Sequence, residues 1–125
     1  MKIAVIEDNP THLELIVTIL KSNSVDTVVT AEDGMHGYQL VQDENPDLVL
    51  MDLDLPIANG YQVASNLRME PQFADLPMIA VTSANPRMVR DKSLQAGFDD
   101  VVSKHNLKKE LPEILDAFLD EVAAG

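Results

Sequence analysis

Three carboxylates, a hydroxyl and an ammonium stand at the ends of short apolar runs in this 125-residue chain. The acidic pair Glu7-Asp8 ends one run, and Asp52 ends another. Thr82 and Lys104 each end, or nearly end, a later run of the same kind. If the four runs are parallel strands of one sheet, their carboxyl ends meet at one edge and these side chains converge there. Such a pocket can hold Mg²⁺ and accept a phosphoryl group on Asp52.

The three carboxylates are of the type that a magnesium ion requires. Mg²⁺ prefers hard oxygen ligands in octahedral geometry and keeps several waters. Glu7, Asp8 and Asp52 are expected to supply ligands directly or through water, together with a backbone carbonyl from the loop after Asp52. Without a cation, three carboxylates at one edge repel one another and raise at least one pKa. The alternative is that Glu7-Asp8 only complements the dipole of the following helix, which leaves Asp52 unexplained.

The position of Asp52 favours a role as a nucleophile. A carboxylate can attack phosphorus to form an aspartyl phosphate, while Mg²⁺ and Lys104 offset charge on the equatorial oxygens. Thr82 offers a hydroxyl to the same group, and Ser83 offers a backbone N–H. Taken singly, Lys104 is also compatible with a surface lysine, and Thr82 and Ser83 with ordinary residues at a strand end. Their common position at the carboxyl edge favours the functional interpretation.

Asp54 is open to two interpretations. An Asp-x-Asp motif after an apolar run also occurs in phosphatases, where the second aspartate is the acid/base. In the other interpretation Asp54 is a loop residue that offers its backbone carbonyl. A phosphatase is disfavoured because those enzymes place the nucleophile on the first strand and usually need a larger chain with a cap.

The histidines and methionines suggest no separate site. His12, His36 and His105 lack the spacing of metal ligands. His12 falls on the polar side of the first predicted helix, and we expect it to be solvated. The methionines are interpreted as core filler, with Met35 and Met88 on helix faces.

Strand-like and helix-like stretches alternate along the chain. The apolar runs are short and rich in Val, Ile or Leu, as buried parallel strands are. The predicted strands cover about 2–7, 25–30, 47–52, 78–82 and 100–103. The first predicted helix begins at Asn9-Pro10, the second and third cover about 34–44 and 60–69, and the fourth runs from Asn85-Pro86 to Gly97. The fifth covers about 107–122, with Leu119 and Val122 on its apolar face. Five successive β-α units predict a doubly wound α/β fold with helices on both faces of the sheet.

Length and charge indicate the number of domains and exclude some classes of binding partner. A chain of this length predicts one domain over 1–125. Nine basic against 21 acidic residues give a net charge of −12, so direct binding of nucleic acid or an anionic membrane is not expected. The absence of cysteine and of a signal pattern indicates a cytoplasmic protein. Met1 directly precedes the first strand, which favours a natural N-terminus.

Four motifs follow one another along the chain: Glu7-Asp8, Met51-Asp52 with Pro56 and Gly60, Val81-Thr82-Ser83-Ala84, and Gly97-Phe98-Asp99-Asp100 leading to Lys104. In these motifs, and over essentially its whole length, the chain resembles the receiver domains of two-component response regulators. Each motif alone is weak, but the ordered set with its spacing is specific. The resemblance implies a flavodoxin-like, three-layer α/β/α fold whose five-stranded parallel sheet has the order 2-1-3-4-5.

The resemblance also implies a switch rather than an enzyme. Asp52 would take a phosphoryl group from a histidine kinase or phosphotransfer protein. The magnesium ligands would be Glu7, Asp8, Asp52 and the Asp54 carbonyl. Thr82 and Lys104 would contact the phosphoryl oxygens, and Thr82 would move to do so. The added charge, about −1.5 to −2, would bias the face made by the fourth helix, fifth strand and fifth helix, and this face would bind a downstream protein target.

Two positions depart from the family pattern. Three residues before the lysine, the family often has Tyr or Phe, which rotates inward; this chain has Val101, which cannot swing in the same way. After the lysine, the family usually has proline with a cis bond, and here the residue is His105. Because a non-proline cis bond costs about 2.5–4 kcal/mol, we expect a trans bond and an altered start of the fifth helix. These departures keep open a second hypothesis, a pseudo-receiver that binds partners without phosphorylation.

Overall fold

Five strands alternate with five α-helices within residues 1–124, which the computed structural model describes; side chains are described for residues 1–118. The strands are β1 (Lys2–Ile6), β2 (Thr27–Ala31), β3 (Leu48–Asp52), β4 (Met78–Thr82) and β5 (Asp100–Ser103). The α-helices are α1 (Pro10–Ser22), α2 (Gly34–Glu44), α3 (Gly60–Arg68), α4 (Pro86–Ala96) and α5 (Leu107–Ala124). Two short 3₁₀ helices, η1 (Pro71–Phe73) and η2 (Lys104–Asn106), complete the chain order.

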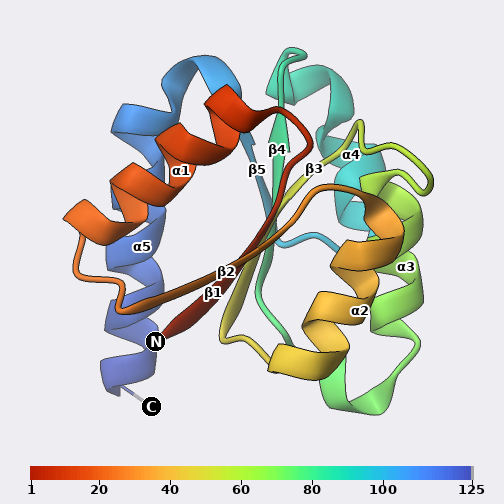
Figure 1. Ribbon diagram of the computed structural model, residues 1–125, viewed down its shortest axis with the longest axis horizontal. Helices are drawn as coiled ribbons and strands as arrows, with labels where there is room; N and C mark the ends of the chain where they lie inside the picture. The colour runs from red at the N-terminus through yellow and green to blue at the C-terminus, as the bar shows by residue number, and fades with distance from the viewer. Residues whose placement is uncertain (125) are drawn as a thin grey trace.

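The strands form one parallel sheet in the order β2-β1-β3-β4-β5. Helices α1 and α5 cover one face, and α2, α3 and α4 cover the other (Figure 1). The predicted doubly wound, three-layer architecture and its strand order are therefore confirmed. Within the described residues, no helix combines the length and apolar character needed to cross a membrane.

The central strand β3 shows how the sheet builds a core on each face. Successive side chains of a strand point to opposite faces, and all five residues of β3 are buried. Leu48 and Leu50 pack with residues of α1 and α5, whereas Val49 and Met51 pack with residues of α2, α3 and α4. Both faces of β3 are thus covered by helices, which explains why the run is continuously apolar rather than alternating.

Asparagine side chains cap the starts of α1 and α4, the helices that follow β1 and β4. Asn9 accepts hydrogen bonds from the backbone N–H groups of Thr11 and His12, and Asn85 accepts one from Arg87. Each Asn precedes a proline at the first helical position, where the missing N–H costs nothing. These Asn-Pro signals predicted both helix starts correctly.

The differences from the sequence predictions are local. Strand β2 begins at Thr27 rather than near residue 25, and the two 3₁₀ helices were not predicted. Met35 and Met88 are exposed, so their interpretation as core filler was wrong. Leu119 and Val122 lie outside the residues whose side chains are described. No cis peptide bond occurs in the described chain, so the Lys104-His105 bond is trans as predicted, and η2 leads from it into α5.

Gly60 lets helix α3 start directly against the end of β3. A Cβ atom at this position would lie 2.5 Å from the carbonyl oxygen of Asp52 and 3.0 Å from the Cα of Leu53. Both contacts are with backbone, which cannot rotate away as a side chain can. The close approach therefore holds the loop that follows Asp52.

We expect Gly60→Ala to destabilise the protein by about 1–3 kcal/mol, the usual cost of overpacking a well-filled site. Helix propensity alone predicts the opposite sign, because Ala is normally better than Gly inside a helix by about 0.5–1 kcal/mol. Urea unfolding followed by circular dichroism measures the difference. Asn66→Ala, at an exposed position of the same helix, is the matched control. A Gly60→Ala protein as stable as wild type would show that the close approach is not required.

Candidate functional site

The register of the strands sets the positions of the predicted site residues. β1 and β3 are paired up to their carboxyl ends, so Glu7 lies level with Asp52. On the other side of β3, Thr82 ends β4 one residue beyond the level of Asp52. Thr82 pairs with Ser103 of β5, which leaves Lys104 one residue further out. Along the carboxyl edge of the sheet, Thr82 therefore lies one residue and Lys104 two residues beyond the level of Asp52.

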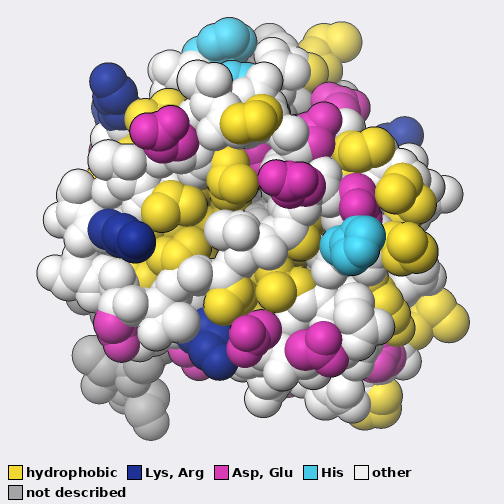
Figure 2. All heavy atoms as spheres, viewed as in Figure 1, with side chains coloured by type: hydrophobic (Ala, Val, Ile, Leu, Met, Phe, Trp, Pro, Cys, Tyr) yellow, Lys and Arg dark blue, Asp and Glu magenta, His cyan; other side chains and the backbone are white. Residues whose placement is uncertain are grey.

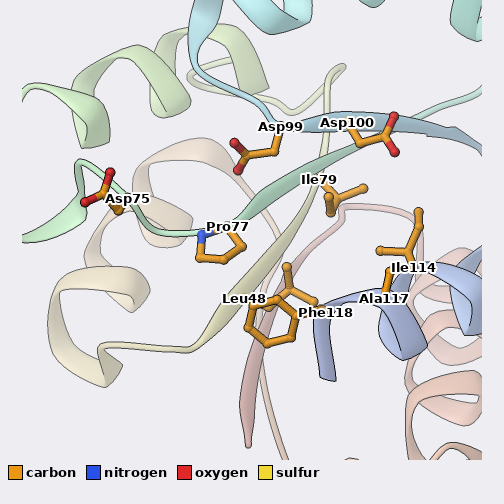
Figure 3. Close-up of a pocket in the computed structure, with 9 residues that line it drawn as sticks. All are labelled: Leu48, Asp75, Pro77, Ile79, Asp99, Asp100, Ile114, Ala117 and Phe118. Atoms are coloured by element: carbon orange, nitrogen blue, oxygen red, sulfur yellow. The ribbon is translucent and has the colours of Figure 1, made fainter. Parts of the chain in front are cut away.

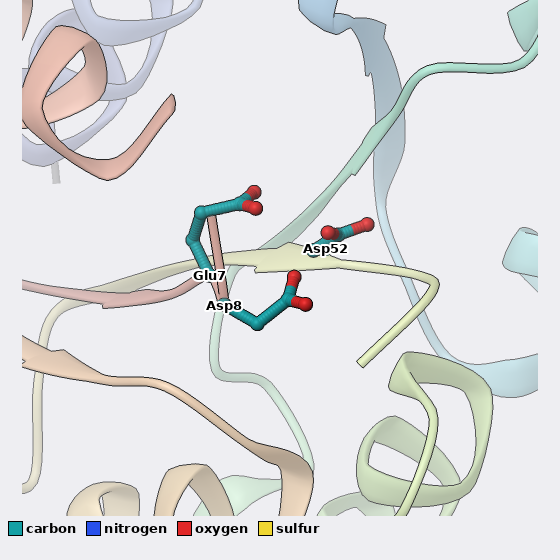
Figure 4. Close-up of side chains that lie close together, drawn as sticks. All are labelled: Glu7, Asp8 and Asp52. Carbon is teal, nitrogen blue, oxygen red and sulfur yellow. The ribbon is translucent and has the colours of Figure 1, made fainter. Parts of the chain in front are cut away.

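Glu7, Asp8 and Asp52 form an acidic cluster at this edge. Each offers a carboxylate oxygen, and these atoms all lie within 4.8 Å of one another. Figure 4 shows the three side chains arising from the adjacent ends of β1 and β3. Glu7 is 1% exposed and Asp52 3% exposed, whereas Asp8 is open to solvent. The cluster is thus buried on one side and accessible from the other.

Lys104, which directly follows the outer strand β5, also reaches this cluster. Its Nζ atom donates hydrogen bonds of 2.9 Å to Asp52 Oδ2 and to Glu7 Oε1, and its side chain is only 7% exposed. Burial disfavours the ammonium, but the bonds to Asp52 and Glu7 outweigh it and raise the pKa of Lys104 above its ordinary value. Lys104 is therefore a fixed positive charge beside Asp52.

The carboxyl group of Glu7 is perturbed by its burial in the site. Burial raises the pKa of Glu7 from 4.5 to about 7, against the opposing effect of the Lys104 hydrogen bond. Its Oε1 atom also accepts from the N–H of Asn9 at 3.1 Å. Within the described residues, its Oε2 atom is buried without any hydrogen-bond partner. A buried, unpaired carboxylate oxygen next to two further carboxylates fits a hard cation such as Mg²⁺.

Backbone groups of the loops hold the remaining polar side chains. Asp52 Oδ1 accepts a 3.0 Å hydrogen bond from the N–H of Asp54. The hydroxyl of buried Thr82 accepts one of 3.0 Å from the N–H of Ala84. Ser83 and the side chain of Asp54 are exposed. The structure therefore orients the Asp52 carboxylate through both of its oxygens, one bonded to Lys104 and one to the loop.

Val101 lies on the other face of the sheet from Lys104. It is buried in the core cluster that includes Val89 and Ala96 of α4. Its strand partner on β4 is Ala80, two residues before Thr82, so Thr82 and Val101 belong to the same face. Val101 thus packs beneath α4, on the same face of the sheet as Thr82.

His12 was wrongly predicted to be a solvated surface residue. It is partly buried, and its Nδ1 atom lies 3.2 Å from Lys104 Nζ. Lys104, the first residue of η2, therefore lies against the polar side of α1 at this point. Helical periodicity identifies a polar face but does not indicate what covers it, so the pattern carried no signal for this contact.

Two surface features can be separated from the site. A cavity of about 390 Å³ lies at the opposite edge, where β3, β4 and β5 begin, with α5 as one wall (Figure 3). None of its lining residues belongs to the acidic cluster. Acidic side chains are also scattered over the face seen in Figure 2, so negative charge alone does not mark the site. What distinguishes the cluster is burial together with Lys104.

Sequence comparisons identify relatives along almost the whole chain. The family model of the response regulator receiver domain matches residues 3–116. The polar-differentiation response regulator DivK of Brucella ovis is 25% identical over 119 residues, which are 95% of this chain and 96% of DivK. Hybrid signal transduction histidine kinase D of Dictyostelium discoideum is 33% identical over 109 residues, which are 87% of this chain but 7% of the kinase. The chain thus matches one small part of that kinase.

A solved structure supports the same assignment. The receiver domain of a sensor histidine kinase from Pseudomonas aeruginosa PAO1 is 29% identical, with a TM-score of 0.85 and coverage of 95% of this chain and 97% of that one. That crystal structure has a magnesium ion coordinated in its active-site cleft. Together with the strand order and the family match, these findings show that the chain belongs to the response regulator receiver domain family of two-component signalling.

Proposed function

We propose that this receiver domain is a switch operated by phosphorylation of Asp52. The magnesium ligands in this proposal are Glu7, Asp8, Asp52 and the backbone carbonyl of Asp54. The phosphoryl group comes from a histidine kinase or a phosphotransfer protein. The whole chain, 1–125, acts as one receiver unit whose product is a changed binding surface rather than a released chemical.

The observation that carries the proposal is the pair of hydrogen bonds from Lys104 Nζ to Asp52 and Glu7. A buried ammonium and two buried carboxylates are costly to desolvate, and a binding module without phosphoryl chemistry would not need them. One ammonium also leaves the three-carboxylate cluster with a net negative charge. The donor set therefore suits a divalent cation, in agreement with the unpaired Glu7 Oε2 atom.

The chemistry follows from the arrangement around Asp52. A carboxylate oxygen attacks phosphorus, the bond from phosphorus to the donor breaks, and the donor leaves with that electron pair. Bound Mg²⁺ neutralises charge on the phosphoryl oxygens. Lys104 supplies a second positive charge to the same oxygens, and the Thr82 hydroxyl and the Ser83 backbone N–H donate hydrogen bonds to them.

The signal leaves the site through the face formed by α4, β5 and α5. Thr82 must give up its bond from Ala84 to reorient toward a phosphoryl oxygen. The space that Thr82 vacates is on the side of Val101 and α4. Val101 acts here as a packing element that follows α4, because its short side chain cannot swing between two positions as an aromatic ring does.

Helix α4 also has the surface that a protein partner needs. Met88 is 81% exposed and Leu94 42% exposed on this helix. On a helix that moves with the switch, such exposed apolar side chains are available to contact a protein partner. We therefore assign binding of the downstream target to this face.

Phosphorylation is tested by intact-mass measurement after incubation with acetyl phosphate and Mg²⁺. Wild type should gain one phosphoryl group, and Asp52→Asn should gain none. Asp54→Asn is the matched control, because it removes a neighbouring carboxylate while keeping the backbone carbonyl, and it should still gain one. If wild type gains nothing from either acetyl phosphate or a cognate kinase, the pseudo-receiver hypothesis takes its place. Multiple turnover of a phosphomonoester, lost in Asp54→Asn, would instead indicate a phosphatase.

The raised pKa of Glu7 predicts how pH and Mg²⁺ affect stability. The folded, metal-free protein keeps the Glu7 proton up to a pKa of about 7, whereas the unfolded chain loses it near 4.5. Stability from this group is therefore fully present below pH 4.5 and is lost as pH rises through 7. Between mildly acidic and mildly alkaline pH, the melting temperature of metal-free wild type should accordingly fall more than that of Glu7→Gln.

Mg²⁺ should reverse this loss, because a cation binds the ionised carboxylate and stabilises the folded state by mass action. At alkaline pH, added Mg²⁺ should raise the melting temperature of wild type more than that of Glu7→Gln. Glu14→Gln, which removes an exposed carboxylate of α1, controls for net charge. Equal pH and Mg²⁺ responses in the Glu7 and Glu14 variants would exclude Glu7 as the perturbed ligand.

The path of the signal is tested by amide NMR of the phosphorylated protein. Chemical shifts should change at the site and also along α4 and β5, because Thr82 and Val101 pack toward that helix. Helix α2 is the internal reference, because it packs on β2 and β1, which lie on the far side of the sheet from β5. Changes confined to the loops around Asp52 would contradict transmission through this face.

A further inference from the structure

We propose that His12 is a positioning residue that holds Lys104 in place for phosphoryl transfer to Asp52. The proposal rests on the function proposed above and adds a residue that the acidic cluster and the lysine do not include. Its basis is the 3.2 Å contact between His12 Nδ1 and Lys104 Nζ. His12 acts through Lys104 and is not itself in contact with the reacting atoms.

The contact completes the hydrogen bonding of the ammonium. A lysine ammonium has three N–H donors, and Lys104 Nζ has three partners, which are Asp52 Oδ2, Glu7 Oε1 and His12 Nδ1. An ammonium cannot accept, so His12 Nδ1 must be the acceptor. The tautomer that fits this contact carries its proton on Nε2.

The start of α1 is built so that His12 reaches this position. Asn9 accepts a 3.1 Å hydrogen bond from the backbone N–H of His12, and Pro10 sets the first helical residue. Side chains on a helix lean toward its amino end, and α1 begins two residues after Asp8. The same cap that begins the helix therefore points His12 at the site.

His12 differs from the other two partners of Lys104 because it has no carboxylate. Glu7 and Asp52 are the groups that a cation or a phosphoryl group would also engage, so their bonds to Lys104 compete with the chemistry. An imidazole has no such second task here and adds no negative charge to an already acidic cluster. Because a lysine side chain has many rotamers, a third, non-competing acceptor keeps its ammonium directed at Asp52.

The first test compares rates of phosphoryl uptake from acetyl phosphate. His12→Leu keeps the approximate size of the side chain but removes the acceptor, and it should react about tenfold more slowly, the effect of losing one hydrogen bond to a charged group. His12→Asn keeps an acceptor oxygen near the place of Nδ1 and should recover most of the rate. His36→Leu, which removes an exposed histidine on α2, should react as wild type does. A normal rate in His12→Leu, or a rate in His12→Asn as low as in His12→Leu, would overturn the proposal.

A double-mutant cycle tests whether His12 acts through Lys104. In a Lys104→Ala background, His12→Leu should cause no further loss of rate, because the group that it positions is gone. A tenfold loss in both backgrounds would show that His12 acts independently of Lys104, and the positioning role would be wrong.

NMR of the Lys104 ammonium separates this proposal from the proposed function. Its protons should exchange with water slowly in wild type and in His12→Asn, and faster in His12→Leu, without any phosphodonor or metal. If wild type takes no phosphoryl group at all, the proposed function fails, and this exchange still decides whether His12 holds Lys104. Equal exchange in all three proteins would overturn the contact itself.

Discussion

The ion pair of Lys104 with Asp52 and Glu7 is the interaction on which the rest of the site depends. It joins the first, third and last strands of the chain through one ammonium group. Burying these charges costs desolvation energy that the pairing only partly returns, so the arrangement is not a general means of stabilising a fold. It is consistent with a site in which charge must be held ready for a reaction.

Burial explains the unusual properties of Glu7. It makes ionisation of the Glu7 carboxyl unfavourable, and the nearby Asp52 carboxylate adds to this effect. The pKa of Glu7 is raised for this reason, and its second oxygen has no described partner. In the proposed function, a proton and a magnesium ion are alternative ways to satisfy the same buried group. Metal binding and ionisation of Glu7 are then linked.

In the proposed function, the alternation of side chains across the sheet separates the phosphorylation site from the surface that responds to it. Asp52 follows Leu48 and Leu50 in the alternation of β3, toward α1 and α5, where His12 and Lys104 meet. Thr82 follows Met78 and Ala80 in β4, toward the face of α4 and Val101. Residues one step apart in register thus serve opposite faces. Thr82 is the point at which a change at Asp52 can pass to the other side of the sheet.

Much of the fold and of the site could be read from local patterns. Short Val-, Ile- and Leu-rich runs predicted the strands, and the Asn-Pro pairs predicted two helix starts. Because parallel strands of one sheet share a carboxyl edge, the residues that end those runs had to converge, which singled out Glu7, Asp52 and Lys104. The family resemblance then supplied the strand order, which periodicity alone does not determine.

Only the tertiary structure decided how those residues are paired, buried and ionised. Lys104 and His12 are 92 positions apart, and the polarity of α1 does not reveal that Lys104 lies against its first turn. The exposure of Met35 and Met88 likewise depends on which elements pack nearby. Residue type and spacing determine which chemistry is available at the sheet edge. Burial and partner choice are properties of surfaces brought together from distant parts of the chain, so they are settled only when the chain has folded.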